Sequence, residues 1–97
     1  MHRTDPARRR VVITGIGVVS PNGVGREAFA RALREGRSGV SRIDAFDTSK
    51  LKSWAAGVVR DLDLSAVMDA VDLRRVPRMV PLALAAGREA LEQAGFA

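Results

Sequence analysis

The stretch VVITGIGVVS, residues 11–20, decides the fold of this chain. Its apolar and β-branched residues occupy odd and even positions alike, so it lacks the alternation of a half-exposed strand. Such a strand is buried on both faces, as in the parallel or mixed sheets that carry helices on each side. Pro21 cannot donate to a strand ladder, and Asn22 and Gly23 are turn residues. The stretch therefore predicts a buried strand in an α/β fold.

A helix is predicted over residues 26–35. Phe29 and Leu33 lie four residues apart and share its apolar side, and Gly36 follows as a left-handed stop. The N-cap is predicted at Gly25, a weak choice because glycine has no side chain to accept a hydrogen bond.

Two short elements and a longer helix are predicted in the rest of the chain. We expect a strand over residues 54–59 and a short helix over residues 64–69, with Asp63 as its N-cap. If the last helix begins at Pro77, Pro81 removes its first backbone hydrogen bond and bends its first turn. The core face of this helix, which ends near Ala94, is predicted to comprise Leu82, Ala83, Ala86, Ala90, Leu91 and Ala94. Its many alanines allow another backbone to come close.

These elements do not complete a fold. A strand buried on both faces needs a neighbouring strand on each side, and only one or two short candidates remain to flank residues 11–20. The sequence therefore predicts that the chain is part of a larger α/β structure.

The composition excludes most catalytic chemistry from this chain. With 97 residues it forms one domain at most, it has no cysteine, and its one histidine is His2. No serine lies in a nucleophile motif of the G-x-S-x-G type. The acidic pairs Asp44/Asp47 and Asp61/Asp63 are typical of caps and turns rather than metal ligands. We expect no catalytic residue, cofactor or metal site here.

The net charge of +5 raises the question of nucleic-acid binding. Residues 1–60 carry 12 basic and 5 acidic side chains, net +7, whereas residues 61–97 carry 4 and 6, net −2. Four arginines lie in the first ten residues, and we interpret residues 1–8 as a flexible basic N-terminus. Because the aromatic residues are scattered singly and offer no stacking surface, nucleic-acid binding is disfavoured.

Membrane insertion and secretion are not expected either. The longest apolar run, residues 11–19, is about half of the ~20 residues that a spanning helix needs. Two glycines interrupt the same run, and no cleavage site of the signal-peptide type follows it. We expect a cytoplasmic protein that does not enter a membrane.

The pattern Gly15-x-Gly17-x-x-Ser20 has the outline of a dinucleotide-binding loop. Ser20 stands at the third glycine position, Pro21 follows it, and the helix begins only near Arg26. No acidic residue ends a second strand some 20 residues later, so the pattern disfavours nucleotide binding.

Five segments, taken in order, resemble the β-ketoacyl-acyl-carrier-protein synthases of fatty-acid and polyketide synthesis. They are RRVVITGIGVVSPNG (9–23), GRSGV (36–40), IDAFDTS (43–49), AGVV (56–59), and the arginines at 74–75 followed by LALAA (82–86) and EALEQAG (89–95). The resemblance covers nearly the whole chain. It is stronger for the separate, fatty-acid-type enzymes than for modular polyketide synthases.

The resemblance implies a thiolase-like fold, in which two α/β halves each hold a mixed five-stranded sheet with helices between and outside the sheets. Residues 9–97 would form the first part of the N-terminal synthase domain, incomplete in this chain. In this family a cysteine takes an acyl chain, and malonyl-carrier protein loses carbon dioxide beside two histidines or a histidine and an asparagine. The resulting carbanion attacks the thioester. These family residues lie beyond position 97, and the glycine-rich strand is scaffold.

The resemblance also implies partners. Arg74 and Arg75 match basic residues with which fatty-acid-type synthases dock the acidic acyl carrier protein. The third basic position of the family falls at Val71, so Arg78 is expected to complete the patch. The two arginines are predicted at the entrance of the last helix, where cations are electrostatically disfavoured. The remainder of the synthase, as a homodimer or heterodimer, is the other expected partner.

Two alternatives stay open. Residues 76–82 read VPRMVPL where the family carries polar and aromatic residues, which leaves room for a chain-length-factor type of subunit that lacks the active cysteine. The chain would otherwise be a truncated or split, non-catalytic interaction piece. In either case the 97-residue chain alone is expected to be inactive.

Overall fold

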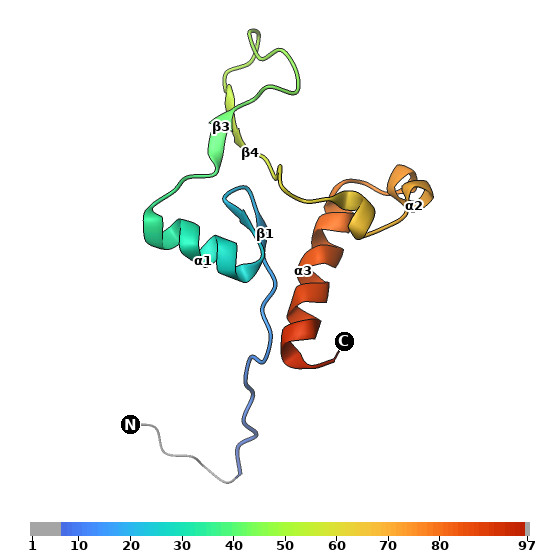
Figure 1. Cartoon of the computed structure of the whole chain (residues 1–97). Helices are drawn as coiled ribbons and strands as arrows, with labels where there is room; N and C mark the ends of the chain where they lie inside the picture. Colours follow the sequence, from blue (N-terminus) through green and yellow to red (C-terminus); the bar gives the residue numbers. More distant parts are fainter. Residues whose placement is uncertain (1–6, 97) are drawn as a thin grey trace.

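The computed structural model describes residues 7–96, so most of the predicted basic N-terminus, including His2, lies outside the described residues. The helices are α1 (Arg26–Glu35), α2 (Ala70–Arg75), α3 (Met79–Ala94) and one turn of 3₁₀ helix, η1 (Leu64–Ala66). The strands are β1 (Val19–Ser20), β2 (Gly23–Val24), β3 (Val40–Arg42) and β4 (Ala55–Gly57). In Figure 1 the N-terminal segment rises between α1 on one side and α3 on the other, and the β3–β4 hairpin projects beyond them.

The predicted ten-residue strand is only partly formed. Of residues 11–20, only β1 belongs to a ladder, pairing antiparallel with β2 across the turn at Pro21 and Asn22. The described part of the chain supplies no strand beside residues 11–18. Val11 is 92% exposed and Ile13 is 83% exposed, so the first part of the segment expected to be buried on both faces is uncovered.

Helix α1 has the predicted bounds. Gly25 precedes it without a side-chain cap, and Gly36 ends it with a φ of 67°, in the left-handed region that glycine adopts without strain. Its amphipathic pattern turns Ala32 fully inward, to 0% exposure. Local signals were sufficient to define this helix.

The second half of the chain differs from the prediction in two places. Asp63 does act as an N-cap and accepts the N–H of Ser65, but η1 is short, and a separate helix, α2, follows with Asp69 as its cap. Helix α3 begins at Met79, not at Pro77. Pro81 is therefore the third residue of the helix, where an N–H would have no intrahelical acceptor, so it removes no hydrogen bond and imposes no bend.

The predicted strand over residues 54–59 is also shorter than expected. Only β4 pairs, antiparallel to β3, with Val40 opposite Gly57 and Arg42 opposite Ala55. Arg42 places its guanidinium 4.8 Å from the centre of the Trp54 ring, a cation–π contact at the base of the hairpin loop.

The chain does not close a core of its own. Among the described residues only Ala32 and Pro81 are buried. The radius of gyration is 18.1 Å, compared with about 12.5 Å for a compact domain of this length. No helix in residues 7–96 is long and apolar enough to span a membrane.

Candidate functional site

The glycines of the N-terminal stretch form the contact with α3. A Cβ at Gly15 would collide with the carbonyl oxygen of Ala90, and one at Gly17 would collide with that of Ala86. Only glycine lets the two backbones approach this closely. The small side chains of the alanines in α3 also permit this close approach, as the sequence predicted. Leu91 and Ala83, also predicted for this face, are exposed instead.

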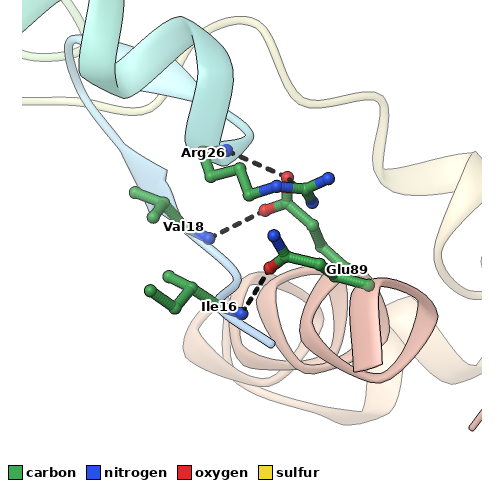
Figure 2. Close-up of polar contacts among 5 residues, drawn as sticks. Ile16, Val18, Arg26 and Glu89 are labelled. Carbon is green, nitrogen blue, oxygen red and sulfur yellow. Dashed lines mark hydrogen bonds and ion pairs between the residues drawn. The ribbon is translucent and has the colours of Figure 1, made fainter. Parts of the chain in front are cut away.

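Two side chains of α3 hydrogen-bond the backbone beside these glycines (Figure 2). The Oε1 atom of Gln93 accepts the N–H of Ile16 at 2.8 Å, and Oε1 of Glu89 accepts the N–H of Val18 at 2.9 Å. The second oxygen of Glu89 accepts the N–H of Arg26 at 2.9 Å and pairs with its guanidinium at 3.3 Å. We call this contact of Ile16, Val18, Arg26, Glu89 and Gln93 the polar junction.

The polar junction stabilises the charged form of Glu89. Burial alone would raise the pKa of this carboxyl, but the N–H groups of Arg26 and Val18 and the Arg26 charge outweigh burial and hold the pKa below its ordinary value. A negative charge at this place also complements the positive end of the α1 dipole. The carboxylate thus joins α3 to the N-terminal segment and to the start of α1, which lie 71 and 63 residues away in sequence.

This geometry gives the glycine motif a structural explanation. In a dinucleotide-binding loop, the glycines and the helix N-terminus face a pyrophosphate. Here Gly15 and Gly17 face α3, and a carboxylate of the same chain already occupies the N-terminus of α1. The stretch is scaffold rather than a nucleotide site.

The predicted docking arginines lie at the end of α2, which corrects their expected electrostatics. Arg74 and Arg75 form its last turn and are exposed, with no ion pair or hydrogen bond from either side chain within residues 7–96. Cations in the last turn of a helix interact favourably with its dipole, so the penalty expected at a helix entrance does not arise. Val71 on the same helix is 50% exposed.

Arg78 is placed differently. It precedes the first residue of α3, and its guanidinium donates to the carbonyl oxygen of Val59 at 2.9 Å. No polar contact in the described part of the chain joins Arg78 to Arg74 or Arg75. One donor of the Arg78 guanidinium is therefore used to connect the start of α3 to Val59.

Three of the four residues in the acidic pairs contact other residues of the chain. Asp44 pairs with Arg60 at 3.1 Å, Asp47 accepts the N–H of Ser49, and Asp63 caps η1. The N–H of Ser49 lowers the pKa of Asp47. No group of three or more metal-ligating side chains occurs within residues 7–96.

The contacts of the polar side chains of α3 were not predicted from the sequence. Glu89 and Gln93 lie on the alanine face beside Ala86 and Ala90, and a carboxylate and an amide within a small-residue stripe are the signal that indicates a polar contact with another segment. Arg88 was missed as well. Its guanidinium donates to the carbonyl oxygens of Ala66 and Val67 at 3.2 and 3.3 Å.

Comparison with known proteins gives one consistent family. Residues 8–97 match the β-ketoacyl synthase N-terminal domain. The chain is 38% identical over 90 residues to 3-oxoacyl-[acyl-carrier-protein] synthase 2 of Vibrio harveyi, covering 93% of this chain and 22% of that protein. It is 46% identical over 89 residues to a putative polyketide β-ketoacyl synthase 1 of Streptomyces halstedii, covering 91% and 21%.

A solved structure shows the same fold. The ishigamide ketosynthase/chain length factor superposes with a TM-score of 0.81 at 41% identity, over 94% of this chain and 23% of that chain. The fold is thus that of one part of a thiolase-like ketosynthase, and the chain spans about a fifth of the length of the curated relatives it matches. The agreement of the family match, the sequence identities and the superposition shows that this chain belongs to the β-ketoacyl synthase family.

Proposed function

We propose that residues 9–97 are the first part of the N-terminal domain of a cytoplasmic β-ketoacyl-acyl-carrier-protein synthase. The observation that carries the proposal is the family match over residues 8–97, and the exposed apolar residues Val11, Val12 and Ile13 agree with it. An apolar segment that is exposed at residues 11–14 and packs only against α3 farther along requires further strands and helices. In the proposed complete protein these come from the remainder of a mixed five-stranded sheet.

The complete protein would perform acyl transfer followed by a decarboxylating Claisen condensation. A cysteine thiolate takes the acyl group from its thioester, malonyl-carrier protein releases carbon dioxide, and the resulting carbanion attacks the enzyme thioester to form the new carbon–carbon bond. The present chain has no cysteine, so the nucleophile belongs to another part of the protein. The contribution of this chain is scaffolding and partner binding.

The binding surface that we propose for the acyl carrier protein consists of the docking arginines, Arg74 and Arg75, completed by Arg78. The exposure and free charge of Arg74 and Arg75 support this assignment. Carrier proteins of this pathway are acidic, and complementary charges speed association. Arg78 contributes less, because its guanidinium also binds Val59.

A second candidate is a chain-length-factor type of subunit, which keeps the fold without the active cysteine and works in a heterodimer. The ketosynthase/chain length factor similarity at 41% identity favours keeping this candidate. The two candidates share the scaffold and differ in residues outside this chain.

Condensation activity tests the proposal. The complete protein carrying this chain, incubated with acyl- and malonyl-carrier protein, should release carbon dioxide and form a β-ketoacyl product. The 97-residue chain alone should match the protein-free blank, because it can neither hold the acyl group nor stabilise the carbanion. Product from the complete protein only in the presence of a second, cysteine-bearing subunit would support the chain-length-factor candidate. No product under either condition would refute both.

A further inference from the structure

Helix α2 is weakly held by packing. None of its six residues is buried, and only Leu73 is even half-buried. The preceding turn, η1, has no buried residue either. A short helix with so little apolar contact does not keep a defined position by itself. Yet this helix presents Arg74 and Arg75.

Arg88 connects this region to the rest of the chain. Its two terminal nitrogens donate to the carbonyl oxygens of Ala66 and Val67, at 3.2 and 3.3 Å. Ala66 is the last residue of η1, and Val67 caps it. Carbonyl oxygens at a helix end carry partial negative charge and lack intrahelical donors, so a guanidinium forms charge-assisted bonds with them. Asp69, the N-cap of α2, follows two residues after Val67.

The other end of this connection is well fixed. Arg88 lies beside Glu89 on α3, and Glu89 is anchored to Val18 and Arg26 through the polar junction. Successive residues of a helix point about 100° apart, so Glu89 contacts the N-terminal segment while Arg88 reaches η1. α3 thereby serves as the frame from which η1 and α2 are placed.

We propose that Arg88 is a positioning residue for carrier-protein docking: it ties the C-terminal end of η1 to α3 and so holds α2 where Arg74 and Arg75 meet the carrier protein. The inference rests on the proposed function for its partner. Arg88 itself does not contact the carrier protein, because its guanidinium is occupied by Ala66 and Val67. The tie restricts α2 to its docking position before the partner arrives, which lowers the ordering cost of binding.

Two measurements on the complete protein carrying this chain test the tie and the docking separately. Hydrogen exchange followed by mass spectrometry reports the protection of α2, residues 70–75, without any partner. Titration with a holo acyl carrier protein reports affinity. The variants are Arg88→Met, which keeps the aliphatic stem, Arg88→Lys, which restores the charge and some donor capacity, and Arg31→Met as control. Arg31 is an exposed α1 arginine without a polar contact in residues 7–96, so its replacement removes the same charge.

Arg88→Met should speed exchange in α2 at least threefold and weaken carrier binding by about three- to tenfold, with Arg88→Lys in between and Arg31→Met like the parent. If hydrogen exchange in α2 is unchanged in Arg88→Met, the proposal that Arg88 holds η1 and α2 in place is wrong. Faster exchange with carrier affinity equal to the parent overturns the positioning of the docking arginines. A parent protein that binds no carrier protein overturns the proposed docking function itself, and the exchange data then still decide whether Arg88 holds α2.

Discussion

Glu89 caps α1 from a different helix: its Oε2 atom accepts the N–H of Arg26, the first residue of α1, at 2.9 Å. Gly25 stands at the N-cap position directly before α1, but it has no side chain to accept a hydrogen bond and adopts a φ of 95°. A glycine with positive φ and a carboxylate distant in sequence together replace the usual serine or aspartate cap. The same carboxylate accepts the N–H of Val18 at 2.9 Å. One side chain therefore fixes the position of the start of α1 relative to the N-terminal segment.

Removing this cap should destabilise the fold. In the complete protein, Glu89→Ala should lower the free energy of unfolding by about 1–2 kcal/mol, the cost typical of a lost N-cap. Glu89→Gln, which keeps an acceptor and loses the charge, should cost less. Chemical denaturation measures both. Glu92→Ala is the matched control, because its exposed side chain makes no polar contact in the described residues; an equal loss at position 92 would contradict the assignment.

The contribution of Glu89 should also depend on pH. Its pKa is lowered by folding from an ordinary value of 4.5, so the native state favours the charged form. The associated stability is complete above the unfolded-state pKa and disappears as the pH falls through the folded-state pKa. The stability difference between the parent protein and Glu89→Gln should therefore stay constant above about pH 6 and shrink on acidification below the unfolded value. A stability difference that grows on acidification would contradict a lowered pKa of Glu89 in the folded state.

The close approach at Gly17 predicts a steric effect. Gly17→Ala places a Cβ against the carbonyl oxygen of Ala86, and one of the two backbones must move. Overpacking of this kind costs roughly 1–3 kcal/mol. Gly87→Ala is the control, since a Cβ there meets nothing within 4 Å and α3 should gain about 0.5–1 kcal/mol of helix propensity. Thermal unfolding of the two variants should shift in opposite directions, and a harmless Gly17→Ala would refute the contact.

Charge reversal tests the proposed docking surface. Arg74→Glu with Arg75→Glu should raise the carrier-protein KM mainly through slower association, while turnover of a small pantetheine thioester stays nearly unchanged. Salt at about 0.5 M should remove much of the difference, because exposed charges are screened over a few Å. Arg31→Glu with Arg34→Glu changes the charge equally on α1 and should have little effect. Equal losses on both substrates would indicate a folding defect.

The chain studied alone should behave as an unfinished fold. Val11, Val12 and Ile13 are 92, 68 and 83% exposed, and residues 11–18 have no ladder partner among residues 7–96. Exposed apolar strand edges pair with other chains. We expect concentration-dependent association and no cooperative thermal transition, measured by light scattering and circular dichroism. A monomer with a cooperative transition and dispersed amide resonances would contradict this.

Local signals in the sequence predicted α1 and the cap of η1 correctly. The bounds of α1 follow from its amphipathic spacing and from Gly36, whose left-handed conformation ends the helix within one residue. The capping of η1 by Asp63 was readable for the same reason, since the hydrogen bond to Ser65 spans two residues. The order of five motifs predicted the synthase family, which the comparisons confirm.

The sequence near residues 74–81 is compatible with more than one helix start, which is why the start of α3 and the position of Arg74 and Arg75 were predicted wrongly. Two prolines four residues apart allow a helix to begin at either, and the chain instead ends α2 at Arg75 and starts α3 at Met79. The arginines consequently lie at a helix end rather than an entrance, which reverses the sign of the dipole interaction.

By itself, the sequence determined the family, the limits of α1 and the need of residues 11–20 for partners, because caps, periodicity and apolar runs act over a few neighbouring residues. Only the tertiary structure decided which groups meet across the chain. Glu89 reaches Arg26 over 63 residues and Val18 over 71. Such contacts form only after the intervening chain has folded back, and their geometry depends on Gly15 and Gly17 admitting α3. Residues 11–18 illustrate the same rule: the pattern encodes a strand, but a ladder exists only where a second backbone supplies its hydrogen bonds.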